Sequence, residues 1–113
     1  MQIKVNITKL TEQLAGLSET DLNALLDARD ADPFDSAWCE VNELVGGSER
    51  YPNAKDTFVR VSEATNQHEI ASYIADDLDL MFRAARAEVE TPFLAFLSDC
   101  YARGMVPTQW RNI

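Results

Sequence analysis

The sequence predicts an all-α protein, a compact bundle of five to six helices that forms a single helical domain over residues 1–113. Three observations predict it: helix-capping signals recur along the chain, apolar residues between them repeat at helical spacing, and strand-like alternation is confined to the N-terminus. The length suits one domain. The hydrophobic fraction of 46% and the charged fraction of 26% are typical of a folded globular protein.

Pairs of polar residues, some followed by proline, mark the expected helix starts. These start signals are Ser18 with Asp21, Asp32 before Pro33, Asn53 with Asp56, Asn66 with Glu69, and Thr91 before Pro92. The helices that they predict cover residues 19–29, 33–45, a segment through Phe58 and Ala64, 68–88 and 93–103. The first two of these helices are expected to form an αα-hairpin that ends at Gly46 and Gly47.

The N-terminal segment is mixed in character. Residues 2–7 alternate between polar and apolar side chains, which suits a short edge strand, whereas residues 8–17 suit a helix. Cys39 and Cys100 each lie among apolar residues without a nearby histidine or second cysteine, so both are expected to be buried, reduced thiols.

The net charge of −9 restricts the classes of partner. Nucleic acid phosphates and anionic membranes would repel such a surface, so direct binding to either is disfavoured and a basic protein partner is favoured. Acidity that serves only solubility remains the alternative. The chain shows neither a signal peptide nor an apolar run of transmembrane length, and a cytoplasmic location is therefore expected.

Residues 19–49 hold nine carboxylates against one base, Arg29. Asp21 and Asp32 lie at predicted helix starts, where carboxylates accept backbone N–H bonds. Carboxylates on the rest of this stretch are free to meet a partner. The candidate partner-binding residues here are Asp27, Asp30, Asp35, Glu40 and Glu43.

Asp76, Asp77 and Asp79 lie in the middle of the longest predicted helix, where helix propensity gives no reason for three aspartates. A helical projection points Asp76 and Asp79 away from the buried face and places Asp77 at its edge. All three are candidate partner-binding residues, and Asp77 could also accept a hydrogen bond from a neighbouring helix. The donors considered for it are Arg60, Arg83 and Arg86.

Metal binding and catalysis find little support in the sequence. The run from Asp30 resembles the start of a calcium loop, but Asp35 stands in place of the turn glycine and Val41 in place of the bidentate glutamate. His68 is the single histidine, so zinc and di-iron sites lack ligands. We therefore expect no metal, no cofactor and no enzymatic activity, and Asp77 remains the one candidate for carboxylate chemistry.

The segments HEIASYIADDLDLMFRAA and TPFLAFLSDCYARGMVP, within about residues 67–107, resemble the C-terminal half of small acidic bacterial proteins of the toxin-immunity type. This resemblance implies a stoichiometric inhibitor that covers the basic active site of a toxin, commonly a nuclease. An anti-defence protein that presents its acidic surface to a nuclease or a nucleoprotein defence complex would use the same chemistry.

The interpretation that the sequence favours is thus a non-catalytic inhibitor of a basic protein, with Tyr51 or Trp110 as an aromatic anchor at the interface. Two alternatives stay open. One is a self-assembling structural subunit, for instance a homodimer, whose acidity only confers solubility. The other is a small carboxylate-based or metal-dependent hydrolase.

Overall fold

The computed structural model describes residues 3–110 and confirms the all-α prediction. Among these residues there are six helices and no strand. The helices are α1 (Ile7–Ala15), α2 (Glu19–Asp30), α3 (Phe34–Val45), α4 (Ala54–Thr65), α5 (His68–Ala87) and α6 (Pro92–Ala102). None of them is both long enough and apolar enough to cross a membrane.

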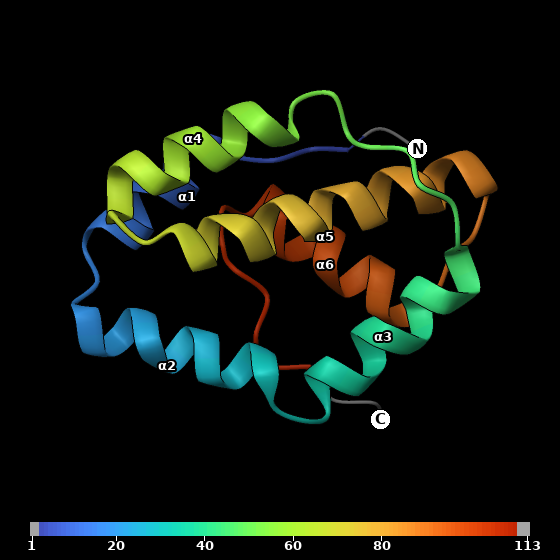
Figure 1. The fold of residues 1–113 in the computed structure, drawn as a ribbon, viewed down its shortest axis with the longest axis horizontal. Helices are drawn as coiled ribbons and strands as arrows, with labels where there is room; N and C mark the ends of the chain where they lie inside the picture. The colour runs from blue at the N-terminus through green and yellow to red at the C-terminus, as the bar shows by residue number, and fades with distance from the viewer. Residues whose placement is uncertain (1–2, 111–113) are drawn as a thin grey trace.

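Helix α5 is the central element of the bundle (Figure 1). It contacts α2, α3, α4 and α6, and its most extensive contact is with α4, which also covers α1. In the view of Figure 1, α4 lies along the upper edge of the molecule and α2 along the lower edge. Helices α2 and α3 follow one another at an angle and do not fold back side by side, so the expected αα-hairpin does not form (Figure 1). Both helices lie on the side of α5 opposite to α4.

The hydrophobic core surrounds α5 and α6. Ile74 and Leu78 of α5 and Leu97 of α6 have no exposed surface, and Leu10 of α1 and Val61 of α4 close the core from the other side. The buried residues Ile70, Ile74, Leu78 and Met81 of α5 follow the spacing of three and four that keeps one helix face apolar. Because α4 and α6 cover part of the α5 surface, α2 and α3 pack against the part that is left.

The alternation in residues 2–7 leaves a short edge strand open, and the structure shows no strand in residues 3–6. The backbone N–H of Asn6 donates to the carbonyl of Tyr101 at 3.0 Å, and its side chain caps α1 by accepting from the N–H of Lys9. Because Asn6 caps α1 and Ile7 is its first residue, the last two positions of the segment 2–7 belong to the start of a helix. Gln2, the first residue of the expected strand, lies outside the described residues.

Two of the predicted caps form as expected. Ser18 and Asp21 make a reciprocal capping box, with N–O distances of 3.1 and 3.4 Å. The hydroxyl of Thr91 accepts from the N–H of Leu94 at 3.1 Å, with Pro92 as the first residue of α6. Both helix starts could be predicted because the capping residues lie within three positions of each other.

Three other predicted caps differ from expectation. Asn66 adopts a left-handed conformation that ends α4, and the side chain of Gln67 instead caps α5 by accepting from the N–H of Glu69. Asn53 makes no side-chain cap. α3 begins one residue later than predicted, with Asp32 accepting from the N–H of Ser36 at 3.2 Å.

Two leucine-to-alanine substitutions, one at a buried and one at an exposed residue, test the position of the core. We expect Leu97→Ala to lower the free energy of unfolding by about 2–5 kcal/mol, because it opens a cavity at a site with no exposed surface. Leu44 is 64% exposed, so Leu44→Ala is expected to change stability by about 0.5 kcal/mol or less. Urea unfolding followed by circular dichroism measures both, and equal losses in the two variants would contradict this core.

Candidate functional site

A buried ion pair links α2 to α5. The guanidinium of Arg29 donates to both carboxylate oxygens of Asp77, at 2.6 and 2.9 Å. The same carboxylate accepts from the indole Nε1 of Trp38 at 2.9 Å and from the hydroxyl of Tyr101 at 2.5 Å. Because these donors lie on α2, α3 and α6, one carboxylate on α5 joins four helices.

The electrostatic environment keeps this network in one protonation state. Burial by itself would lower the pKa of Arg29, but the negative charge of Asp77 and contacts with Tyr101 raise it above its usual value. Burial, and then the charge of Asp77, raises the pKa of Tyr101 well above the ordinary value of a phenol. Arg29 is therefore a cation and Tyr101 a neutral hydrogen-bond donor at neutral pH.

The donors predicted for Asp77 are wrong. Arg60 instead forms an ion pair with Asp56 on the same helix. Arg86 pairs with Glu49, with 3.8 Å between Nε and Oε1. The guanidinium of Arg83 donates to the carbonyl of Gly46 and to the side chain of Asn42.

Several sequence-predicted contact residues already have intramolecular partners. Asp79 is half-buried and accepts from the backbone N–H of Tyr51 at 2.7 Å, which holds the loop after α3 against α5. The ring of Tyr51 packs against Phe82, with 5.8 Å between centroids. Trp110 is half-buried against Phe93, at 5.3 Å, and a second phenylalanine of α6.

The nine carboxylates of residues 19–49 are all exposed, including Asp27, Asp30, Asp35, Glu40 and Glu43. The chain has 19 acidic and 10 basic residues, so ten acids and nine bases lie outside this segment. Its one base, Arg29, is buried against Asp77. We call these nine exposed carboxylates the acidic face.

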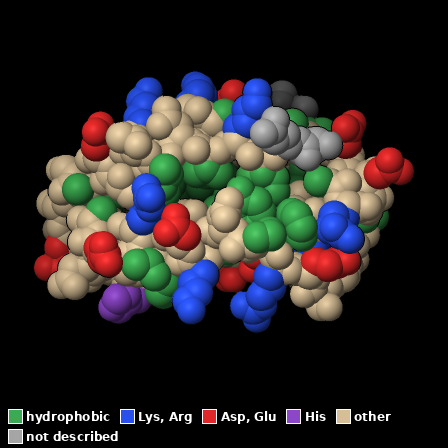
Figure 2. Space-filling view, turned by 90° about the horizontal axis from the view of Figure 1, so that it is seen from above, with side chains coloured by type: hydrophobic (Ala, Val, Ile, Leu, Met, Phe, Trp, Pro, Cys, Tyr) green, Lys and Arg blue, Asp and Glu red, His purple; other side chains and the backbone are tan. Residues whose placement is uncertain are grey.

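The side of the molecule that carries α4 has a different character. Figure 2 looks onto that side, where lysine and arginine side chains are interspersed with acidic ones around hydrophobic side chains. Seven of the nine carboxylates of the acidic face lie on α2 and α3, the helices on the lower and right edges of Figure 1, and Asp32 and Glu49 lie in the loops that follow these helices. The charge of the protein is therefore distributed asymmetrically about α5.

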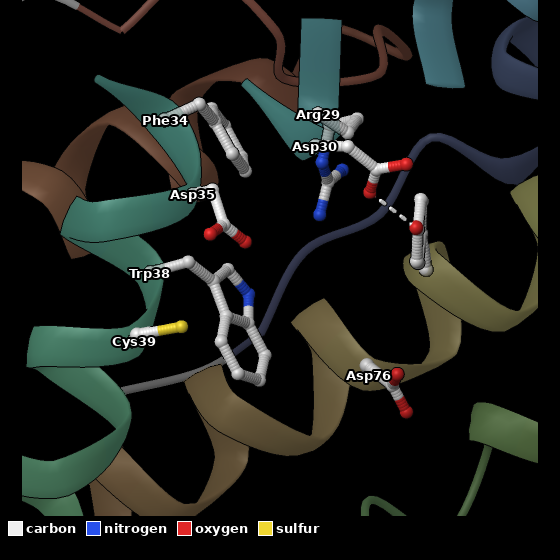
Figure 3. A pocket seen from close by; sticks show the side chains of 8 residues that line it. Arg29, Asp30, Phe34, Asp35, Trp38, Cys39 and Asp76 are labelled. Atoms are coloured by element: carbon white, nitrogen blue, oxygen red, sulfur yellow. Dashed lines mark hydrogen bonds between the residues drawn. The ribbon is translucent and has the colours of Figure 1, made fainter. Parts of the chain in front are cut away.

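A cavity of about 200 Å³ opens at the acidic face between α2, α3 and α5 (Figure 3). We call it the α2–α3–α5 cavity. Aromatic side chains form part of its wall, and three carboxylates and the Arg29 guanidinium complete it. Its lining residues are Arg29, Asp30, Phe34, Asp35, Trp38, Cys39, Tyr73 and Asp76.

Asp76 and Tyr73 of this cavity have pKa values that their surroundings raise. Partial desolvation, followed by the charges of Asp77 and Asp79, raises the pKa of Asp76. The hydrogen bond that Tyr73 donates to Asp30 is the main cause that raises the pKa of Tyr73 to about 12.

The two cysteines have different environments. Cys100 is buried, as predicted, whereas the prediction for Cys39 is wrong, because this thiol is exposed at the cavity. Desolvation and then the charge of Asp35 raise the pKa of Cys39, which keeps it a thiol at neutral pH. Within residues 3–110, no three histidine, cysteine or carboxylate side chains lie together as a metal site.

The model of the family described as "Immunity protein PIM1" matches residues 2–108. The chain belongs to this family. No curated protein and no solved structure gives a significant match. Membership in the PIM1 immunity family confirms the resemblance to toxin-immunity proteins and indicates an inhibitor-type protein that binds a toxin.

Adjacent aspartates of the PIM1-family fold allow a matched test of the buried ion pair. Asp77→Asn leaves the buried charge of Arg29 uncompensated, and we expect it to lower the free energy of unfolding by about 3–5 kcal/mol. Asp76→Asn changes an exposed carboxylate and should stay within about 0.5 kcal/mol of the unmodified protein. Chemical denaturation at pH 7 distinguishes them, and a small effect of Asp77→Asn would show that the pair contributes little.

The raised pKa of Asp76 gives a pH-dependent expectation. A carboxyl whose pKa is higher in the folded than in the unfolded state opposes folding when it is ionised, above its folded pKa. Asp76→Asn should therefore increase stability slightly at pH 7, and this gain should disappear as the pH falls below the unfolded pKa of about 3.9. Unfolding curves from pH 3.5 to 7 measure the difference, and a gain that grows on acidification would contradict the sign of the shift.

Proposed function

We propose that the chain inhibits a toxin by covering a basic surface of it, such as the active-site groove of a nuclease, with the acidic face of α2 and α3. The observation that carries this proposal is the set of nine exposed carboxylates in a segment whose one base is buried. Membership in the immunity family supports an inhibitor. The acidic face supports a basic target.

Electrostatic complementarity supplies both selectivity and speed. A groove that binds nucleic acid concentrates positive charge to neutralise phosphates, and a dense acidic face presents the opposite potential. Such steering raises association rates by about 10-fold to 1,000-fold and weakens as ionic strength rises. A fast-binding inhibitor suits a cell that must neutralise a toxin before the toxin reaches its substrate.

The scaffold holds this face in place before the partner arrives. Arg29 of α2 and Trp38 of α3 both donate to Asp77 of α5, so the two helices that carry the carboxylates are fixed to the centre of the bundle. A preorganised surface loses less conformational entropy on binding.

We propose the residues that contact the toxin from the solvent exposure of their side chains. It includes Asp76 together with the exposed acids of the acidic face, and it leaves out Asp77 because that side chain has no exposed surface. Asp79, Tyr51 and Trp110 are half-buried, so each can offer one edge to a partner at the margin of the interface.

The test begins with the tagged protein as bait for its toxin in native lysate, followed by kinetics with the purified toxin. Asp27→Lys, Glu40→Lys and Glu43→Lys combined should reduce the association rate by about tenfold or more at low salt and flatten its salt dependence. We expect inhibition of the toxin to weaken in parallel. Surface plasmon resonance at two ionic strengths measures the rates.

A control triple variant, Glu12→Lys, Glu63→Lys and Glu90→Lys, makes the same change in net charge at exposed residues outside the acidic face. It should retain most of the association rate. Equal losses in the two triple variants would mean that only net charge matters. Binding of the toxin without any salt dependence would contradict an electrostatic interface altogether.

A further inference from the structure

We propose that the α2–α3–α5 cavity receives an arginine side chain of the toxin. This inference rests on the proposed function, since it names the group that the acidic face binds. The argument uses the size of the cavity, the pairing of its charged groups, an unsatisfied donor in its wall and its aromatic lining.

The size of the cavity suits one side chain. Its volume of about 200 Å³ is below the range of about 300–1,000 Å³ that small-molecule sites occupy. It opens on the acidic face, and the Arg29–Asp77 pair with Trp38 fixes the three helices around it. A long side chain from a docked protein can enter such an opening.

The charge balance of the cavity favours a cation. The positive charge of Arg29 is paired with Asp77 at 2.6 Å, so the pair is neutral overall. The charge of Arg29 also acts on Asp76, but burial and the charges of Asp77 and Asp79 outweigh it and raise the pKa of Asp76. Asp30 accepts a hydrogen bond from Tyr73, whereas Asp35 and Asp76 accept none from the described part of the chain. Two carboxylates of the cavity lining therefore have no hydrogen-bond partner among the described residues.

A second observation concerns Arg29, which is only 6% exposed. Its Nε is the one buried side-chain nitrogen or oxygen among residues 3–110 that has no hydrogen-bond partner. The guanidinium points into the space that the cavity residues surround (Figure 3). A buried N–H without an acceptor destabilises a protein by about 1–3 kcal/mol, so the site is incomplete as it stands. The guanidinium of an incoming arginine only donates hydrogen bonds, so the acceptor for this N–H would have to be a carbonyl of the docked protein.

The aromatic wall selects arginine over lysine. Phe34, Trp38 and Tyr73 line the cavity, and Trp38 and Tyr73 keep part of their rings exposed, whereas Phe34 is buried. Planar guanidinium groups stack on exposed rings and are more weakly hydrated than an ammonium group. The wall already binds one guanidinium in this way, because Cζ of Arg29 lies 4.3 Å from the ring centre of Phe34 and 5.5 Å from that of Tyr73. Guanidinium groups also donate two hydrogen bonds to one carboxylate.

The test uses Nα-acetyl-L-arginine methylamide as the probe and the full chain labelled with ¹⁵N. The probe carries the guanidinium together with two carbonyl acceptors. We expect a saturable shift of the Trp38 indole N–H signal with a dissociation constant of about 1 mM, the weak affinity that one side chain can supply. The Trp110 indole lies outside the cavity lining and should not shift, which makes it an internal reference.

Matched controls separate recognition from general charge attraction. The citrulline analogue has the same shape without the charge, and it should give no shift. Asp35→Asn with Asp76→Asn should weaken probe binding about tenfold or more, whereas Asp27→Asn with Glu43→Asn removes the same charge outside the cavity and should leave binding nearly unchanged. Equal weakening by both pairs, a shift with citrulline, or no shift with arginine would each overturn the proposal.

Cys39 provides a readout with the toxin itself. Its thiol is exposed at the cavity, so a bound arginine should slow its alkylation by N-ethylmaleimide, while Cys100 is buried throughout. Failure of both the probe and this protection, with salt-dependent toxin binding retained, would overturn the cavity proposal alone. If the lysine substitutions on the acidic face left toxin binding unchanged, the proposed function would be overturned. The toxin would then no longer be the expected source of the arginine.

Discussion

The ion pair between Arg29 and Asp77 determines how the helices of this protein sit around α5. Burial of two charges removes them from water, and only close contact and further hydrogen bonds offset that desolvation. Here Asp77 accepts four hydrogen bonds, from Arg29 twice and from Trp38 and Tyr101 once each. A network of this kind requires one arrangement of α2, α3 and α6, because any shift would leave a buried charge unpaired.

The same pair also shapes the surface. Arg29 is the one base among nine acids in residues 19–49, and on the surface it would partly neutralise its neighbours. Its burial against Asp77 withdraws one positive and one negative charge together, so the protein keeps its net charge while α2 and α3 present only carboxylates. The interaction that fixes the fold therefore also leaves α2 and α3 without an exposed base, whereas Glu49, in the loop after α3, lies beside Arg86.

The sequence predicted the fold class and most helix boundaries because capping is a local property. Ser18 and Asp21 lie three residues apart, and their roles follow from that spacing alone. The error at Asn66 arose because two adjacent polar residues could each cap α5, and Gln67 does so while Asn66 ends α4. Short-range rules do not decide between neighbours whose roles depend on the angle between two helices.

The site was predictable only in part, for a related reason. Exposed acids could be assigned from their position on a helix, but the partner of Asp77 is 48 residues away, and no local pattern connects it with Arg29. The one signal in the sequence was that Arg29 is the single base among the nine acids of residues 19–49, which marks it as a candidate partner for Asp77. The prediction for Cys39 is wrong because apolar neighbours in sequence do not determine burial, and α3 turns this thiol towards the cavity.

The neighbouring aspartates of α5 show how one helix serves both sides of this structure. Successive residues on a helix are about 100° apart, so Asp76 and Asp77 cannot share an environment. Asp77 enters the core and joins the four helices, while Asp76 stays exposed at the cavity, where the charge of Asp77 contributes to its raised pKa. A cation bound beside Asp76 would relieve that repulsion, which couples the proposed binding site directly to the interaction that holds the fold together.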